Sequence, residues 1–336
     1  MTRRISLGIP AAAAFAVAAG VTTLSLHAQQ RVPPAPQYTQ VADGDLKIVY
    51  LAGTKSGGVR TPGEPTFANM YAIVGGGSDR HTVSLELDDG ALLLDTKPAR
   101  LGARLLEKVK LATANPVTII VNSNPGGAAS NAIFTDVVDI YAHENTKARL
   151  AKMDAFKGPN ARFLPNKTFK DKLTVPLKSM GASTGTNRLD MYYFGRAHSD
   201  GDLIAVLPAF ALAYFGELLP GRMTPTIDVE NGGSTLAFAD TLDRAIEGLK
   251  DAGVENIVPA HAPAPYKAIL RWMSLRDLRD YAEFMRAFVN ATKAAHAAGK
   301  SVDDAVAGLM LPEKFKAYGM QTARANVESI YSELKR

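Results

Sequence analysis

A strand-like run that ends in amide and hydroxyl side chains is the stretch of this sequence best suited to hold a ligand. The β-branched residues at 117–121 predict a buried strand, and Asn122, Ser123 and Asn124 follow it before a Pro-Gly-Gly turn and an Ala-rich segment. Residues just past the carboxyl end of such a strand face the crevice where α/β proteins bind ligands. We therefore predict a crevice lined by these three side chains, which with nearby backbone N–H groups could cradle a carboxylate or a phosphate.

Other kinds of site chemistry have less support in the sequence. The chain has no cysteine, so it forms no disulfide and uses no thiolate as nucleophile or metal ligand. Ser123 has no histidine beside it in this stretch and no nucleophile-elbow pattern around it. The glycine run at 75–77 is not followed by a helical pattern, which a phosphate-cradling loop requires.

The elements that must position these residues alternate between strands and helices. Apolar and β-branched runs predict strands at 46–51, 70–74, 82–87, 91–95, 203–207 and 256–259. Helical spacing of apolar residues predicts helices at about 101–109, 129–141, 242–252 and 272–298. Hairpins that feed into such an alternation indicate an α/β fold in which helices cover sheets.

The N-terminus has the layout of a secretory signal peptide. Arg3 and Arg4 precede a long apolar run that ends near Leu26, so we predict a signal peptide at 1–28, a polar lead-in at 29–45 and the folded domain at 46–336. Leu26 occupies a position where a small residue is usual, so an uncleaved membrane anchor is the alternative. In either case we expect an exported protein, periplasmic or secreted.

The charge pattern restricts the partners. The net charge of +5 falls to about +3 when the two arginines of the leader are removed, and the remaining Lys and Arg are scattered over helix-like segments. We therefore expect no nucleic-acid partner. A small-molecule ligand or a periplasmic protein partner fits this composition, and contact with a membrane is expected only if the leader stays uncleaved.

The stretch at 117–131 resembles the signature of the metallo-β-lactamase superfamily, in which a strand runs into THxHxDHxGxN. When the two are aligned on Asn131, the first two motif histidines fall on Asn122 and Asn124, the aspartate on Gly126 and the third histidine on Gly127. Further blocks resemble periplasmic members of this superfamily in the same order: AHENTKARL, FLPNKTFKDKLTV, MYYFGRAHSDGD, LAYFGELLP and VPAHAP. The resemblance covers roughly 46–336 and implies a four-layer αββα sandwich, two mixed β-sheets flanked by helices.

The same resemblance implies where a metal would bind and which ligands have changed. It places His198, Glu217 and His261 at ligand positions, with Asp202 in support of His198. Zinc prefers histidine nitrogens and carboxylate oxygens, whereas Asn122 and Asn124 offer a neutral amide oxygen. Gly126 and Gly127 offer no side chain, so we expect the dinuclear centre to be lost. For the other mature histidines, His81, His143 and His296, we expect structural or solvent-exposed roles.

Two interpretations of the crevice follow. In the first, the protein is a pseudoenzyme that has no cofactor and binds a small ligand or a protein partner in the crevice. A simpler form of this interpretation is that the glycines only relieve a turn that a metal ion no longer holds. In the second, it is a hydrolase with one metal ion, zinc or iron, held by His198, Glu217 and His261. The missing aspartate would normally orient the attacking water, so ordinary hydrolysis would be slow. Since one fold hosts many reactions, the resemblance does not select a substrate.

Overall fold

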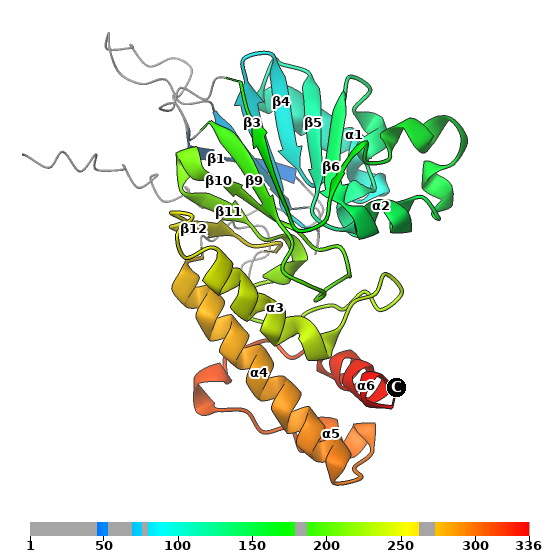
Figure 1. Cartoon of the computed structure of the whole chain (residues 1–336), viewed down its shortest axis with the longest axis vertical. Coiled ribbons are helices and arrows are strands. Elements are labelled where there is room, and N and C mark those ends of the chain that lie inside the picture. Colours follow the sequence, from blue (N-terminus) through cyan, green and yellow to red (C-terminus); the bar gives the residue numbers. More distant parts are fainter. Residues whose placement is uncertain (1–45, 53–68, 76–79, 179–186, 262–272, 336) are drawn as a thin grey trace, which may run out of the picture. The chain divides into compact units, whose positions relative to one another are not determined.

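The computed structural model describes residues 46–52, 69–75, 80–178, 187–261 and 273–335, which all belong to one compact unit (Figure 1). The predicted signal peptide at 1–28 and the polar lead-in at 29–45 lie outside the described residues. Within the described ranges, no helix has both the length and the apolar composition that a membrane span needs.

The larger sheet has seven strands in sequence order, and it carries the strand that precedes Asn122–Asn124. Its first four strands are antiparallel, and from β4 onward the pairing is parallel. Because β4, β5 and β6 are parallel, their carboxyl ends all lie at the same end of the sheet. The strands are β1 (Leu46–Ala52), β2 (Met70–Gly75), β3 (Thr82–Leu87), β4 (Gly90–Leu94), β5 (Val117–Asn122), β6 (Asp139–His143) and β7 (Lys167–Phe169).

The smaller sheet has five strands in the order β12-β11-β10-β9-β8. Only β11 and β12 pair in parallel, and the other neighbours are antiparallel. The strands are β8 (Lys172–Pro176), β9 (Arg188–Tyr192), β10 (Ile204–Leu207), β11 (Leu212–Tyr214) and β12 (Asn256–Val258). The predicted strands at 203–207 and 256–259 correspond to β10 and β12.

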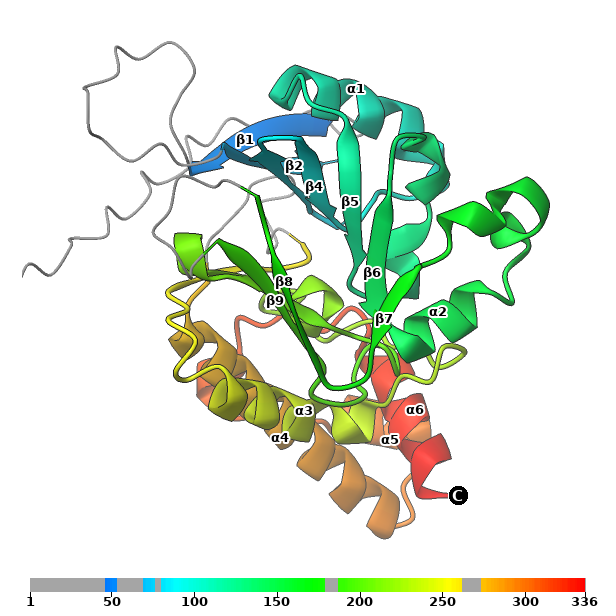
Figure 2. The ribbon, with the colours of Figure 1, turned by 45° about the horizontal axis from the view of Figure 1, so that its top comes forward.

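The two sheets pack face to face, and helices cover their outer sides (Figures 1 and 2). Leu85 and Leu92 of the larger sheet share a buried cluster with Leu189 and Met191 of the smaller one. Burial of apolar side chains between the sheets and under the helices is the main favourable term that holds these layers together. The helices are α1 (Gly102–Ala112), α2 (Glu144–Leu150), α3 (Thr235–Gly248), α4 (Leu275–Ala297), α5 (Val302–Ala307) and α6 (Ala323–Leu334).

Each covering layer follows from an amphipathic pattern. Leu105 and Val109 of α1 pack on Leu93 and Ile120 on the outer side of the larger sheet. The helices α3 and α4 cover the outer side of the smaller sheet, where Phe238 joins one buried cluster with strand residues. The predicted αββα sandwich with two mixed sheets is therefore confirmed.

The helix predicted at 129–141 is wrong. The chain forms two short 3-10 turns, Pro125–Ala128 and Asn131–Ile133, and then enters β6. Tertiary hydrogen bonds take the backbone groups that a helix would use, because the Gly127 carbonyl oxygen accepts from the N–H of Thr96 at 2.7 Å and from its hydroxyl at 2.8 Å. The β-branched and aromatic residues after 136 then pair with β5, which outweighs the Ala-rich start.

Candidate functional site

The motif positions gather where strands of both sheets end. Asn122 closes β5, and Ser123 and Asn124 follow it directly, while Glu217 follows β11 and His261 follows β12. Strand ends that meet at one edge bring together residues far apart in sequence, as open α/β architectures generally do. The predicted neighbourhood of these residues is therefore present, and its internal contacts decide what it can do.

Asn122 is buried and is fully engaged by the protein. Its Nδ2 donates to Asn131 Oδ1 at 3.1 Å and to the Gly127 carbonyl oxygen at 3.0 Å, and its Oδ1 accepts from Asn131 Nδ2 at 2.9 Å. Asn131 also donates to the Phe163 carbonyl oxygen at 3.2 Å. Both asparagines are completely buried, so this pair of amides fastens the turn after β5 and does not line an open crevice.

Ser123 is engaged by a buried carboxylate that sequence reasoning did not single out. Its backbone N–H and its hydroxyl each donate to Asp95 at 2.6 Å, and the Tyr214 hydroxyl lies 2.8 Å from Asp95 Oδ2. Burial raises the pKa of Asp95, and the nearby Arg80 charge and the Ser123 hydrogen bonds partly offset this. A Cβ added at Gly127 would lie 2.0 Å from Asp95 Oδ1, so only glycine fits there.

Arg80, which lies just before β3, reaches into the motif with its guanidinium group. Its Nη1 donates to Asn124 Oδ1 at 2.8 Å, and its Nη2 lies 3.1 Å from Glu217 Oε1. A Cβ added at Gly126 would lie 2.6 Å from that Nη2 atom. The sequence does not indicate this role of Arg80, because nothing in a residue 44 positions before Asn124 shows that the two side chains touch.

Buried Glu217 pairs with the partly buried His261. His261 Nε2 lies 3.0 Å from Glu217 Oε2 and 3.2 Å from Oε1. Burial alone would raise the pKa of Glu217, but the charges of His261 and Arg80 outweigh it and hold this pKa well below its usual range. Burial lowers the pKa of His261, and the charge and hydrogen bond of Glu217 more than compensate, so its pKa is raised. Arg80, Glu217 and His261 thus form a connected charged triad.

His198 is buried beside the site and is oriented by the backbone. Its Nδ1 lies 2.9 Å from the Thr226 carbonyl oxygen, which leaves Nε2 as the other ring nitrogen. Asp202 accepts from the Ser199 N–H and hydroxyl, each at 2.7 Å, and so shapes the turn after His198. Burial raises the pKa of Asp202 to about 6, against the opposing effects of the His198 charge and these hydrogen bonds.

Solved structures that resemble this chain share its fold at low sequence identity. A double mutant of the sec-alkyl sulfatase PisA1 is 13% identical with a TM-score of 0.58, and the match covers 79% of this chain and 49% of that one. The stereoselective inverting sec-alkylsulfatase Pisa1 from Pseudomonas sp. is 14% identical with a TM-score of 0.57, covering 79% and 48%. This chain therefore spans about half the length of the alkylsulfatase structures it matches.

A third structure, the metallo-β-lactamase from Pontibacter korlensis, is 16% identical with a TM-score of 0.49, and the match covers 75% of this chain and 99% of that one. No family model and no curated protein sequence matches the chain. The layers, the sheet topology and the alkylsulfatase structures agree with one another. The chain has the metallo-β-lactamase fold.

The side chains present do not fit the zinc sites typical of the metallo-β-lactamase fold. Gly126 offers no donor, and the Arg80 guanidinium lies against the place where its side chain would begin. Each oxygen of Glu217 lies within 3.2 Å of a nitrogen of His261 or Arg80. The described part of the chain contains no group of three or more His, Asp or Glu side chains arranged to hold a metal ion. His198, Glu217 and His261 therefore do not form such a group.

The three remaining histidines have structural contacts. His81 is buried with Nδ1 3.0 Å from the Pro259 carbonyl oxygen, and burial together with the Lys97 charge lowers its pKa to about 3. His143 begins α2 by accepting from the Asn145 N–H at 3.2 Å. The ring of His296 meets Tyr331 edge to face, with ring centroids 4.7 Å apart.

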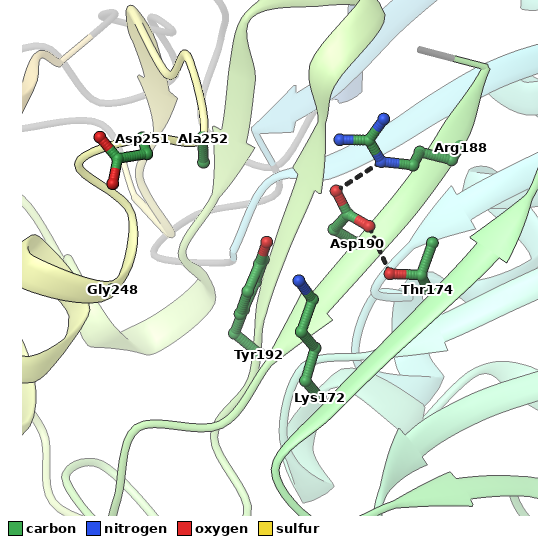
Figure 3. A pocket seen from close by; sticks show the side chains of 8 residues that line it. All are labelled: Lys172, Thr174, Arg188, Asp190, Tyr192, Gly248, Asp251 and Ala252. Carbon is green, nitrogen blue, oxygen red and sulfur yellow. Dashed lines mark hydrogen bonds and ion pairs between the residues drawn. The ribbon is translucent and has the colours of Figure 1, made fainter. Parts of the chain in front are cut away.

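A hollow of about 470 Å³ lies elsewhere, between strands β8 and β9 and the end of α3 (Figure 3). Its buried carboxylate, Asp190, accepts from Thr174 Oγ1 at 2.6 Å and from Arg188 Nε at 2.8 Å. Lys172 Nζ lies 4.9 Å from the centroid of the Tyr192 ring. The lining side chains from β8 and β9 therefore contact one another, and none of the predicted site residues lines this hollow.

Proposed function

We propose that this protein is an exported member of the metallo-β-lactamase fold whose dinuclear zinc motif has been lost, and that it acts without hydrolysis. On this proposal it is a pseudoenzyme that binds a small-molecule ligand or a periplasmic protein partner. One observation carries the proposal: the carboxylate of Glu217, at the motif's metal-bridging position, is bound by Arg80 and His261.

The chemistry of hydrolysis explains why this observation matters. Metal-dependent hydrolysis needs a cation that lowers the pKa of a bound water and a carboxylate that orients this water. Gly126 supplies no carboxylate, and the positive charge of Arg80 beside it repels a metal ion. A guanidinium group has no open coordination position, so it cannot generate a bound hydroxide in place of the metal.

A mononuclear hydrolase is the alternative, and it has some support. His261 and Glu217 are already in contact. The Nδ1 atom of His198 contacts the Thr226 carbonyl oxygen, so its Nε2 atom could ligate a metal ion. Glu217 would have to exchange Arg80 for the metal before such a site could form. The ion pair at 3.1 Å favours the first proposal over this alternative.

Hydrolysis assays on the full-length protein test the choice. The panel contains esters, thioesters, phosphoesters and a secondary alkyl sulfate, since alkyl sulfate is the substrate class named for the two sulfatase structures. The protein is supplied with zinc, iron or manganese and compared with a His198→Ala variant. We expect the same background rate in both proteins. Metal-dependent turnover that disappears in His198→Ala would refute the pseudoenzyme and support the alternative.

A further inference from the structure

We infer that Arg80 is the built-in cation of this site, and that its guanidinium group takes the place and the electrostatic role that a metal ion has in the zinc-binding motif. The inference rests on the proposed loss of that motif and explains how the site stays stable without it. Its basis is the position of the guanidinium, the burial of its partners and the contacts that hold its backbone.

The position of the guanidinium matches three separate motif positions. Nη1 reaches Asn124 and Nη2 reaches Glu217, at 2.8 and 3.1 Å. The same group lies against Gly126, where a Cβ would be 2.6 Å from Nη2 and 2.9 Å from Nη1. The resemblance assigns these positions to a histidine, a bridging aspartate and an aspartate. One cationic side chain thus contacts the replacements of three ligands at once.

The charges of the buried groups require a cation there. The Glu217 side chain is only 7% exposed, and a buried carboxylate is strongly unfavourable unless a cation and hydrogen bonds compensate it. His261 supplies positive charge only when it is protonated. Arginine keeps its charge at every physiological pH, and its planar fork can bind two acceptors in fixed directions. Arg80 therefore compensates Glu217 permanently, as a bound metal would.

Contacts from both sheets hold the backbone at Arg80 and His81. The buried Lys97 ammonium donates to the Arg80 carbonyl oxygen. The His81 N–H donates to the Ala260 carbonyl oxygen at 2.7 Å, and the Tyr214 hydroxyl lies 2.8 Å from the His81 carbonyl oxygen. Ala260 lies one residue before His261, and Tyr214 lies three residues before Glu217. The guanidinium is therefore held in register with the strand ends that carry its partners.

A double-mutant cycle tests this inference on the full-length protein. The variants are Arg80→Met, Glu217→Gln and the double variant, and thermal unfolding is followed with zinc and with a chelator. Arg80→Met should lower Tm, because Glu217 loses its permanent counter-charge, and the double variant should regain part of this loss. Zinc should raise the Tm of Arg80→Met, whose Glu217 is released, and leave the wild-type Tm unchanged.

Two further variants serve as controls. Arg149→Met removes the arginine of the Arg149–Asp200 pair, which contains none of the predicted ligands, so its Tm should not respond to zinc. Arg80→Lys keeps the charge without the fork, and its Tm should lie between those of wild type and Arg80→Met. If Arg80→Met does not fold, Arg80→Lys replaces it in the cycle.

The outcomes separate this inference from the proposed function. Additive Tm losses for Arg80→Met and Glu217→Gln, or a zinc response of Arg80→Met equal to that of wild type, would overturn the role of Arg80 and leave the loss of the zinc motif standing. A zinc-dependent rise in the wild-type Tm that a chelator reverses would overturn both.

Discussion

Gly127 shows how a single position ties the turn after β5 to the neighbouring strand end. Its Cβ position is occupied by the carboxylate of Asp95, at 2.0 Å, although its φ is in the ordinary range. We predict that Gly127→Ala lowers the free energy of unfolding by about 2–4 kcal/mol, because a buried hydrogen-bond network must move. Denaturant unfolding followed by circular dichroism measures this loss.

Gly158→Ala is the matched control for that variant. Gly158 has a φ of 58° and open space around its Cβ position, so alanine there meets only backbone strain of about 1 kcal/mol. If the two variants lost the same stability, the steric role assigned to Gly127 would be wrong.

His81 gives a prediction about pH at the same scale. Its folded pKa of about 3 lies below the unfolded value of 6.5, so the unfolded chain binds the extra proton first as the pH falls. The neutral ring therefore contributes stability above pH 6.5 that is lost between pH 6.5 and 3, on the order of 5 kcal/mol in total. His81→Asn keeps a donor for the Pro259 carbonyl oxygen but does not titrate.

We predict that the free energy of unfolding falls less steeply with acid in His81→Asn than in wild type over that range. Chemical denaturation at several pH values measures the slope. His296→Asn, which changes a histidine outside the site, is the matched control, and its slope is measured in the same way. An unchanged slope in His81→Asn would show that other groups cause the acid sensitivity.

At the scale of elements, the segment that joins β5 to β6 depends on its paired amides. Asn131→Ala would leave the buried amide of Asn122 without its reciprocal partner. We predict a loss of about 2 kcal/mol in the free energy of unfolding, the usual cost of an unsatisfied buried polar group. Asn160 is the control, because its side chain donates to the Ala155 carbonyl oxygen at an exposed position. Asn160→Ala should change the free energy of unfolding by less than about 0.5 kcal/mol. Equal losses would argue against the paired amides as the fastening of this segment.

The same segment shows what sequence patterns can and cannot predict. The β-branched run at 117–121 correctly predicts the strand β5, because burial on both sides of a parallel strand leaves a strong local signal. The Pro-Gly-Gly sequence correctly predicts the turn after it. The Ala-rich residues after 128 favoured a helix, but Thr96 and Asn122 bind the Gly127 carbonyl oxygen from other elements. Hydrogen bonds from distant residues leave no trace in a local pattern.

The site was predictable to a similar degree. Motif order placed Glu217 and His261 in one neighbourhood, and the structure brings them within 3.0 Å. Arg80 was not predictable, since its importance comes from the space that Gly126 vacates and from partners on other strands. A glycine in place of a ligand suggests that another side chain fills the space, but the sequence does not say which one.

At the scale of the whole molecule, the N-terminal leader leads to a prediction about the mature protein. Arg3, Arg4 and the apolar run up to Leu26 are typical of a cleaved signal peptide. We predict that protein recovered from a bacterial periplasm lacks residues 1–28, which intact-mass measurement detects. A full-length mass in the membrane fraction would support the uncleaved anchor.

The metal content of the wild-type protein shows whether Arg80 or a metal ion compensates the charge of Glu217. The mature protein is purified from periplasm without chelators and measured by mass spectrometry of its elements, beside a His198→Ala, His261→Ala double variant. We predict far less than one equivalent of zinc, iron or manganese in both proteins. One equivalent in the wild type that is lost in the variant would contradict this prediction and establish a mononuclear site.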